Sequence, residues 1–386
     1  MQDIDIDDLA YVHISKGLDD VVVKETVLSY IDGENGRLFY VGYPIEELVE
    51  HSTYEEVCFL LLHGRLPKKD ELESFTDLMK SERELPKELV AILSKIPRNS
   101  NLMDVLKFGI DYLAICDEEL QSKGRVDNIV TAAKIISKSS TIVAYAFRYS
   151  EGLEIVRPSQ ELSHAANFLY MVTGVKPDSL SSKIMDVAFI LHAEHELPAS
   201  SMAALVIAST LSDLYSAISG GVGALKGPLH GGANEKALEM ILSIGSPENV
   251  EGYVKQVLAS KGRIMGFGHR VYKSYDPRAA IFRRYLESLS QQRGDRSFLD
   301  ITKKLEEVVR RELAGKPIFP NIDLYSGAVF HMLGLSKRVF TPLFAAARTV
   351  GWAAHVLEYW RDNRLIRPRA TYVGPPMRRY IPVHQR

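Results

Sequence analysis

Apolar residues recur along most of the chain at the three- and four-residue spacing of amphipathic helices. This spacing continues from about residue 44 to about residue 220, with breaks rich in proline and glycine such as those at 64–67 and 157–158. Strand-like alternation is scarce, and residues 26–42 show it best, with apolar positions on both sides of the sequence DGENG. The pattern therefore predicts a mainly α-helical protein with one small β-hairpin near its N-terminus.

The segment Ala199–Gly220 differs from the other predicted helices because apolar or small residues occupy all of its sides. A helix without a polar face is buried, and small side chains allow other helices to approach closely. Two interpretations fit this segment equally well. It is either a central core helix of one subunit or a helix in a subunit interface.

The pattern changes after Gly232. Predicted helices such as 298–313 become charged and amphipathic, and the loops become rich in glycine and proline. The last predicted helix, 340–363, is again alanine-rich and of the buried type. We therefore predict a large helical domain of residues 1–231 plus 335–386 and a small domain of residues 232–334. A cleft between two such domains is the usual place for a ligand.

Composition narrows the classes of function. The 386 residues are 46% hydrophobic and 25% charged, which is typical of soluble globular proteins. A net charge of −2 argues against nucleic acid as the general partner. The N-terminus lacks a signal-peptide pattern, and no apolar run reaches membrane-spanning length. Cys58 and Cys116 lie in apolar helical patterns, so we expect two buried thiols in a cytoplasmic protein with no membrane partner.

His230 lies in an unusual sequence, Gly-Pro-Leu-His-Gly-Gly at 227–232, directly before a helix-forming run. A helix N-terminus presents free N–H groups and a positive field, which disfavours a charged imidazole. His230 is therefore expected to be a neutral hydrogen-bond donor to an oxygen that gains negative charge during a reaction. The alternative is an ordinary turn in which a histidine merely fits.

A second cluster, GFGHRVYKSYDPR at 266–278, again places an imidazole, His269, on a closely approaching glycine backbone. Lys273 and Arg278 add positive charge, and the Asp-Pro turn at 276–277 directs Arg278 inward. The alternative is a surface loop with solvated cations.

A third cluster contains Asp323 among apolar neighbours. Partial burial would raise the pKa of this carboxyl and strengthen it as a base. Aspartate is also favoured as a helix N-cap. From this cluster alone, a cap for a helix beginning near Leu324 is the favoured interpretation.

Two further groups of residues bear on ligands. His192 and His195 have the three-residue spacing of a shared metal site, but their spacing differs from zinc-peptidase patterns and no third ligand is evident. We therefore expect one of them to be packed and the other to face a ligand.

Arg348 interrupts an apolar helix face and requires an anion there. Together, Arg278, Arg348 and Arg367 are suited to binding two carboxylates.

In combination these motifs resemble the citrate synthase family in its short bacterial and archaeal form. GFGHRVYKSYDPR fits the family signature at every constrained position, and GPLHGG and the Asn-x-Asp-x-x-Ser-Gly pattern at 321–327 occur in the family's order. The resemblance extends from Ile31 to Arg369, and it favours a catalytic role for Asp323 over the cap. Val41, where the family often has arginine, and Pro198, where many members have asparagine, depart from the pattern.

The resemblance implies a two-domain helical fold, a role for each site residue, and the condensation of acetyl-CoA with oxaloacetate. Asp323 would remove a methyl proton from acetyl-CoA, His230 would donate to the thioester oxygen, and His269 would polarise the oxaloacetate ketone. Hydrolysis of the citryl thioester would then release citrate and CoA, without a metal or other cofactor. Oxaloacetate would be held by His195, Arg278, Arg348 and, from the other subunit of a homodimer, Arg367. CoA would contact Lys273, Lys316, Ile264, Met265, Gly266, Phe267 and Gly268.

Other functions share these residues. A 2-methylcitrate synthase would use propionyl-CoA with the same catalytic set, since one extra methylene changes preference by only about 1–3 kcal/mol. A non-catalytic CoA-binding regulator on the same fold is disfavoured by the intact Asp323 and both histidines. Citryl-CoA-cleaving relatives have ATP-dependent domains that this sequence lacks.

Overall fold

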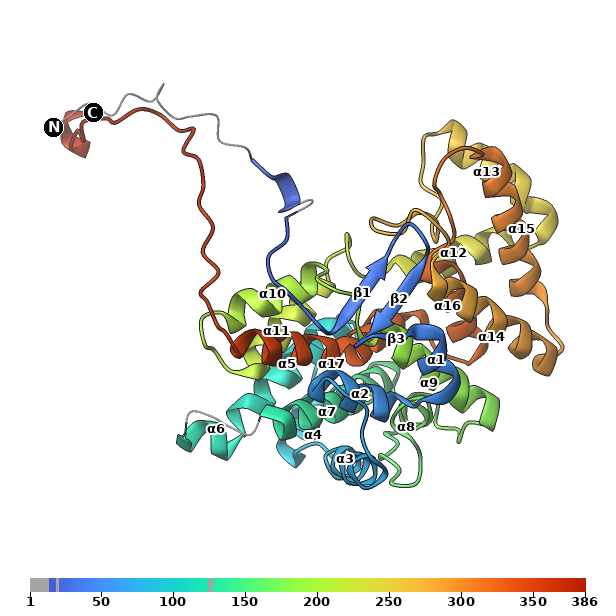
Figure 1. Cartoon of the computed structure of the whole chain (residues 1–386), viewed down its shortest axis with the longest axis horizontal. Coiled ribbons are helices and arrows are strands. Elements are labelled where there is room, and N and C mark those ends of the chain that lie inside the picture. The colour runs from blue at the N-terminus through green and yellow to red at the C-terminus, as the bar shows by residue number, and fades with distance from the viewer. Residues whose placement is uncertain (1–13, 19–20, 124–127) are drawn as a thin grey trace. The chain divides into compact units, whose positions relative to one another are not determined.

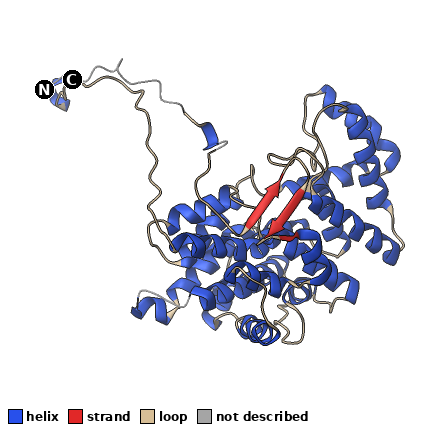
Figure 2. Ribbon diagram, in the orientation of Figure 1, coloured by secondary structure: helices blue, strands red, loops and turns tan. Residues whose placement is uncertain are grey.

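The computed structural model describes residues 14–18, 21–123 and 128–386. Residues 26–364 form one compact unit, and the terminal segments up to Glu25 and from Leu365 onward form a second. The first unit is mainly helical with one small sheet (Figures 1 and 2), which confirms the predicted fold class. Among the described helices, none has the length and apolar character needed to cross a bilayer.

The predicted N-terminal hairpin is present. Strand β1 (Ser29–Asp32) pairs antiparallel with β2 (Arg37–Tyr40), which pairs with the short β3 (Tyr43–Pro44). In the register, Ser29 lies opposite Tyr40. The side chains of Leu38 and Tyr40 are fully buried, so one face of the hairpin packs on the helices.

Helix α17 (Phe340–Trp360) lies in the core of the large helical part of the fold, and its residues are buried along nearly its whole length. The alanine-rich sequence allows this close packing, because small side chains let neighbouring helices approach. Helix α17 contacts α2, α5, α7, α9, α10 and α11. The bounds in this part of the fold are α1 (Ile45–His51), α2 (Tyr54–His63), α3 (Lys69–Ser81), α4 (Lys87–Leu93), α5 (Leu102–Ile115), α6 (Glu118–Lys123), α7 (Asn128–Glu151), α8 (His164–Thr173), α9 (Ser179–Ala193), α10 (Ala199–Ala208) and α11 (Leu214–Leu225).

Five helices between Gly232 and Leu333 pack mainly on one another and gather on one side of Figure 1. Charged and apolar residues alternate along them at helical spacing, as in α15, where Leu305, Val308 and Val309 are buried. They fall within the predicted small domain, 232–334, whose independence as a domain stays a prediction. They are α12 (Ala233–Ile244), α13 (Val250–Ala259), α14 (Pro277–Arg293), α15 (Ser297–Glu312) and α16 (Ile322–Met332).

The single helix expected over 199–220 is wrong. The chain forms α10 and α11 with a turn between them, in which Leu211 has a φ of 63°. The Asp213 side chain accepts the N–H of Ser216 and so begins a new helix. This cap was not recognised in the sequence because the residues around Asp213 are small or apolar. Val206 and Leu211 are also exposed, at 40% and 71%.

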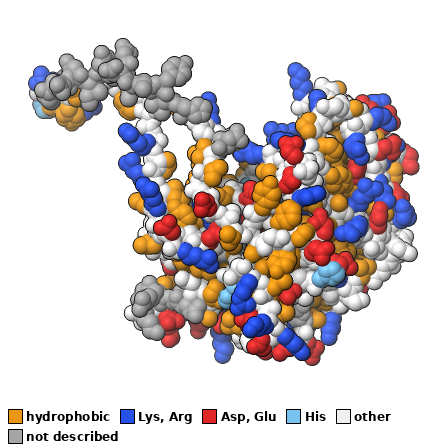
Figure 3. Space-filling view, viewed as in Figure 1, with side chains coloured by type: hydrophobic (Ala, Val, Ile, Leu, Met, Phe, Trp, Pro, Cys, Tyr) orange, Lys and Arg blue, Asp and Glu red, His pale blue; other side chains and the backbone are white. Residues whose placement is uncertain are grey.

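The expectation of two buried thiols holds for one of them. Cys58 is buried in α2, whereas Cys116 is exposed. Cys116 is the C-cap residue of α5, so it lies just beyond the turn whose apolar stripe faces the core. Charges of both signs are mixed over the visible face of the molecule, in keeping with the small net charge (Figure 3).

Candidate active site

The imidazole of His269 is oriented by its own loop. Its Nδ1 accepts the backbone N–H groups of Val271 at 3.0 Å and Tyr272 at 3.2 Å. The ring proton therefore resides on Nε2, which leaves one N–H free to donate to a ligand. Burial lowers the pKa of His269 to about 4, and the positive charge of Arg278 acts in the same direction. His269 is thus a neutral hydrogen-bond donor.

Asp323 is not the helix cap that its sequence context favoured. Asn321 is the N-cap of α16, since its side-chain oxygen accepts the N–H of Asp323 at 3.0 Å. Asp323 is the second residue of the helix, with its carboxyl free for chemistry. Burial raises the pKa of Asp323 to about 6, although nearby Arg278 opposes the rise. The group is therefore an ionised but comparatively strong base at neutral pH.

The loops that carry His269 and Asp323 are joined directly. The amide of Asn321 donates to the carbonyl oxygen of Gly268 at 2.8 Å, and its backbone N–H donates to Gly266 at 2.9 Å. At Gly266, with a φ of +79°, a Cβ atom would lie 2.7 Å from the Cα of Leu324. Only glycine permits this approach, so residues 266–268 lie against the first turn of α16.

Arg278 is buried and ion-paired with Asp276. Its Nε and Nη2 donate to the two carboxylate oxygens of Asp276 at 3.0 and 2.9 Å. Asp276 is also the N-cap of α14 and accepts the backbone N–H of Ile322, the first residue of α16. The Nη1 of Arg278 makes no hydrogen bond to any residue that the structure describes, so it is available to a ligand.

His192 and His195 have separate environments. The Nδ1 of His192 lies 2.7 Å from the carbonyl oxygen of Ala188, and its ring packs among phenylalanines in the core. The Nε2 of His195 lies 3.2 Å from the Tyr272 hydroxyl, and its ring centroid is 5.3 Å from that of His269. Within the described ranges, no group of three or more possible ligands is arranged for a metal.

Arg348 is a buried guanidinium in α17. Its Nε donates to the carbonyl oxygen of His192 at 2.6 Å, and its guanidinium stacks over the Phe344 ring. No carboxylate in the described part of the chain lies within ion-pairing distance of it. Burial lowers the pKa of Arg348 to about 10, against the attraction of Glu194. A buried cation that lacks a direct ion pair is suited to an anionic ligand.

The tautomer of His230 follows from two neighbours. The Nε2 of His230 lies 2.7 Å from the hydroxyl oxygen of Ser200, which also accepts the indole N–H of Trp352 at 3.2 Å. Ser200 is fully buried, and its proton has no other acceptor among the described residues. The hydroxyl therefore donates to Nε2, and the ring proton of His230 resides on Nδ1. Burial, followed by Arg348, lowers the pKa of His230 to about 4, in agreement with the neutral donor predicted.

Helix packing holds the elements that carry His230 and Asp323 together. His230 lies in the turn before α12, and a Cβ atom on Gly327 of α16 would lie 2.7 Å from the carbonyl oxygen of Asn234 in α12. Burial is the largest influence on the pKa of His195, His269 and Asp323, and the positive charge of Arg278 acts with it on the two histidines and against it on Asp323. The arrangement is therefore a base and neutral hydrogen-bond donors around buried positive charge.

The residues predicted for CoA are partly in the loop that precedes His269 and partly exposed lysines. Ile264 is buried, and Phe267 forms an antiparallel bridge with Pro320. Lys273 donates to the carbonyl oxygen of Arg270 at 3.1 Å, and Lys316 is exposed. The remaining members of the predicted CoA set, Met265, Gly266 and Gly268, share the segment of Phe267. Arg367 belongs to the terminal unit, where it is exposed.

Sequence reasoning missed Ser200, Trp352, Asn321 and the pairing role of Asp276. Local signals existed for two of them, since Asn before a helix and Asp before Pro-Arg are both typical N-caps. Ser200 and Trp352 gave no local signal, because the contact joins residues 152 positions apart.

Comparison with known proteins supports the resemblance. Residues 17–369 match the family described as citrate synthase, C-terminal domain. A citrate synthase of Saccharolobus solfataricus is 43% identical, with 97% of this chain and 99% of the relative covered. A citrate/2-methylcitrate synthase of Bacillus subtilis is 40% identical, with coverage of 94% and 97%. A ternary complex of Thermoplasma acidophilum citrate synthase with carboxymethyl coenzyme A and oxaloacetate superimposes with a TM-score of 0.89 at 37% identity, covering 97% and 100%. The chain therefore belongs to the citrate synthase family.

Proposed function

We propose that this chain is an acyltransferase that condenses acetyl-CoA with oxaloacetate and hydrolyses the citryl thioester to citrate and CoA. The observation that carries the proposal is that the rings of His195 and His269 lie 5.3 Å apart, while Asp276 binds both the buried guanidinium of Arg278 and the first N–H of α16, the helix that carries Asp323. This places a base and a neutral donor beside positive charge, as deprotonation of a thioester next to a dianionic ketone requires.

The first step is removal of a methyl proton from acetyl-CoA. Asp323 takes the proton, and the electron pair of the C–H bond moves to the thioester oxygen. That oxygen gains negative charge, which the Nδ1–H of His230 stabilises as it develops. An uncharged imidazole suits this role, because its N–H dipole stays oriented and its proton stays on Nδ1 while negative charge develops on the thioester oxygen.

The second step forms the carbon–carbon bond. The enolate carbon attacks the ketone carbon of oxaloacetate, and the ketone oxygen takes the proton that His269 holds on Nε2. The hydrogen bonds from Val271 and Tyr272 to Nδ1 keep this proton directed away from the loop. The proton taken up by Asp323 then returns to the ring of His269, and hydrolysis of the citryl thioester consumes one water and releases CoA. We assign no metal or other cofactor to either step.

Oxaloacetate brings two carboxylates, and the site offers cations without full partners. Arg348 has no carboxylate partner in the described chain, and Arg278 retains Nη1 beside its pair with Asp276. Planar guanidinium groups bind carboxylates through two parallel hydrogen bonds. We assign His195 to the same substrate, because its ring lies beside that of His269.

For CoA we assign the backbone of residues 264–268, with Lys273 and Lys316 as cations for the phosphates. Residues 266–268 lie against the first turn of α16, so an acyl group following this backbone reaches Asp323. Both lysines are exposed, as contacts to the charged end of a large substrate require.

We further propose a homodimer in which Arg367 completes the oxaloacetate site of the other subunit. Helices α5 and α10 and the turn after α10 carry exposed apolar side chains, including Phe108 at 40%, Val206 at 40% and Leu211 at 71%. Such surface is typical of protein interfaces. We also propose a cytoplasmic location and closure of residues 232–334 over the substrates, because the enolate must be shielded from water.

The proposed activity is tested by measuring CoA release from acetyl-CoA and oxaloacetate with the purified protein. Asp323→Asn is expected to lower kcat by about 100- to 10,000-fold, which is the usual contribution of a positioned general base to the rate. Asp77→Asn, a substitution of the same kind at an exposed position of α3, serves as the matched control. Near-normal turnover by Asp323→Asn would contradict the mechanism.

The name of the Bacillus subtilis relative favours a second candidate, 2-methylcitrate synthesis from propionyl-CoA. The same residues would act, and only the pocket for the acyl chain would differ. The ratio of kcat/KM for acetyl-CoA and propionyl-CoA separates the two functions. A preference for propionyl-CoA would replace citrate by 2-methylcitrate as the product.

A further inference from the structure

The N-terminal hairpin contacts both loops that carry the site histidines. Its strands lie beside the loop of His195, and its turn lies beside the loop of His269, although 165 and 241 residues separate the contacting positions. The mechanism above uses none of the hairpin residues. The DGENG sequence of the turn is therefore a motif without an assigned role.

At the turn, Gly33 is in direct contact with the backbone that orients His269. Its carbonyl oxygen accepts the N–H of Lys273 at 2.9 Å and the hydroxyl of Ser274 at 3.1 Å. A Cβ atom on Gly33 would lie only 2.3 Å from the carbonyl oxygen of Val271. The φ of Gly33 is not in the left-handed region, so glycine is needed here for close approach and not for its dihedral freedom.

The same segment supplies the N–H groups that fix the His269 tautomer. Val271 and Tyr272 donate to Nδ1, and Lys273 follows them and is bonded to Gly33. Gly36 adds a second close approach, since a Cβ atom there would lie 2.5 Å from the carbonyl oxygen of Tyr275. The turn therefore packs directly against the segment that orients the imidazole.

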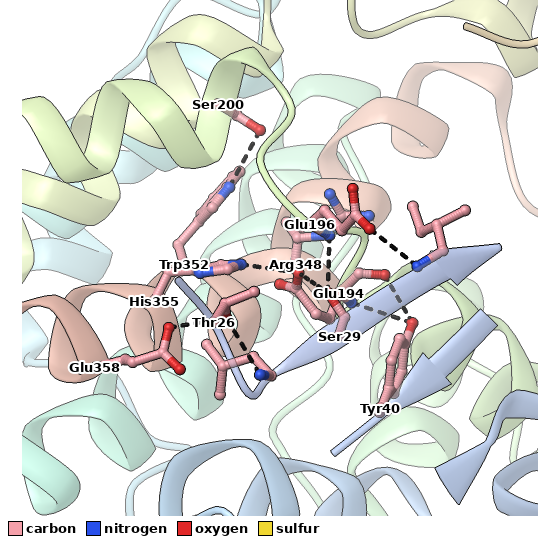
Figure 4. A network of polar contacts seen from close by, with 12 residues as sticks. Thr26, Ser29, Tyr40, Glu194, Glu196, Ser200, Arg348, Trp352, His355 and Glu358 are labelled. Atoms are coloured by element: carbon pink, nitrogen blue, oxygen red, sulfur yellow. Dashed lines mark hydrogen bonds and ion pairs between the residues drawn. The ribbon is translucent and has the colours of Figure 1, made fainter. Parts of the chain in front are cut away.

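At the other end, β1 and β2 hold the two residues that flank His195. The Ser29 hydroxyl donates to Glu194 at 3.0 Å and accepts the N–H of Glu196 at 3.0 Å (Figure 4). The N–H of Ile31 donates to the Glu196 carboxylate at 2.9 Å, and the Tyr40 hydroxyl lies 2.8 Å from the carbonyl oxygen of Glu194. Glu196 has a φ of 58°, an unfavourable conformation for a non-glycine residue that these contacts stabilise.

We propose that the hairpin is a positioning element of the active site, with Gly33 as the positioning residue for His269 and Ser29 as that for His195. The inference rests on the proposed function, which gives the two imidazoles their roles. One rigid ribbon thereby fixes the separation of the rings, whose centroids are 5.3 Å apart. A displacement of about 1 Å at such a site lowers the rate roughly 100-fold.

Two substitutions at the ends of the hairpin should act on different kinetic constants. Gly33→Ala pushes Val271 away and weakens its hydrogen bond to Nδ1, so kcat should fall about 10- to 100-fold. A weaker bond also favours protonation at Nδ1, so the additional loss of rate that protonation of His269 causes, below the pH range in which Asp323 titrates, should begin at higher pH. Ser29→Ala should chiefly raise the KM for oxaloacetate. Glu34→Ala, at an exposed position of the same turn, is the matched control and should leave both constants unchanged.

A spectroscopic measurement separates positioning from general damage to the fold. ¹⁵N-labelled histidine, with His269→Gln to assign the signal, reports which ring nitrogen of His269 carries the proton. Gly33→Ala is expected to change this signal while Glu34→Ala does not. If Gly33→Ala does not fold, Ser274→Ala, which removes one hydrogen bond to Gly33, should shift the signal and kcat in the same direction by a smaller amount.

Unchanged kcat, pH profile and His269 signal in the folded Gly33→Ala or Ser274→Ala protein would overturn the inference. Failure of the proposed function looks different, because the unmodified protein would then release no CoA. The His269 signal would still respond to Gly33→Ala in that case, so the two outcomes are distinguishable.

Discussion

The buried hydroxyl of Ser200 lies 2.7 Å from Nε2 of His230 and determines which nitrogen of that ring carries the proton. Since Trp352 donates to the same oxygen, the hydroxyl proton is directed to the imidazole. Three residues from the turn before α12, from α10 and from α17 thus form one chain of donors. It ends at the Nδ1–H that faces the substrate in the proposed mechanism.

Ser200→Ala is therefore expected to lower kcat about 10- to 100-fold, because His230 loses the bond that fixes its tautomer. The KM for oxaloacetate should change much less. Ser201→Ala is a matched control, since Ser201 is also fully buried in α10 and its hydroxyl makes no hydrogen bond with the described residues. Steady-state kinetics of the two variants check this, and equal effects on kcat would argue against a specific role for Ser200.

The pH dependence should report Asp323. Burial raises the pKa of this carboxyl to about 6, and the base must be ionised to act. The value of kcat/KM for acetyl-CoA should therefore fall as pH is lowered through about 6. His230 and His269, with pKa values lowered to about 4, stay neutral over this interval. A profile that is flat down to pH 5 would exclude Asp323 as the titrating base.

The proposed contribution of Arg367 across the dimer can be tested by mixing two inactive proteins. Arg367→Ala has an intact Asp323, and Asp323→Asn has an intact Arg367. After denaturation and joint refolding, a heterodimer would contain one complete site if Arg367 acts on the other subunit. Recovered CoA release, of up to about a quarter of normal for random pairing, is expected from two-fold symmetry. If Arg367 served its own subunit, the mixture would stay inactive.

The buried pair of Glu194 and His355 should matter for stability. The two groups are 2.9 Å apart and fully buried (Figure 4). Burial acts to raise the pKa of Glu194, but His355 and Arg348 outweigh it and hold that pKa below its usual range. His355→Ala should therefore reduce the free energy of unfolding by about 3–5 kcal/mol, because it removes the ion-pair partner of a buried carboxylate and leaves it, among the described residues, only the Ser29 hydroxyl and the more distant charge of Arg348.

Chemical denaturation at neutral pH checks this value. The matched control is His51→Ala, whose exposed partner Glu47 lies 3.7 Å away and should contribute less than about 1 kcal/mol. The pKa of Glu194 is lowered in the folded state, so the stabilisation is present above the ordinary carboxyl pKa. It is lost as pH falls through the lowered value. Equal changes in the free energy of unfolding for His355→Ala and His51→Ala would show that the buried pair stabilises the fold no more than the exposed pair.

Much of the site was accessible from sequence because its residues lie in short motifs with local causes. His230 precedes a helix, and His269 and Arg278 share one loop, so local sequence indicated them as candidates, while their roles followed from the family resemblance and stay predictions. The cap interpretation of Asp323 was wrong because the preceding Asn321 takes that role, and two competing caps in one motif cannot be ranked from propensity. The break between α10 and α11 was missed for the same reason, since Asp213 is a cap within an otherwise apolar pattern.

What the sequence could not provide is contact between distant segments. Nothing near Gly33 indicates that Val271 will lie against it, and nothing near Ser200 indicates Trp352. Such contacts depend on how whole helices and strands pack, which local periodicity does not encode. The exposed Cys116 is a smaller example, since a one-residue difference in the end of α5 decides whether a thiol faces the core or solvent.

The carboxylate of Asp276 has a further consequence for turnover. It is ion-paired with the guanidinium of Arg278. The carboxylate oxygen that accepts the Nη2 hydrogen bond of Arg278 also accepts the first backbone N–H of α16. A substrate carboxylate that draws Arg278 toward itself must strain or break the hydrogen bond from the Ile322 N–H to Asp276. The next residue, Asp323, donates its N–H to Asn321, the N-cap of the same helix. Under the proposed oxaloacetate assignment, the Asp276 side chain would therefore link substrate binding at Arg278 to the position of the base, Asp323.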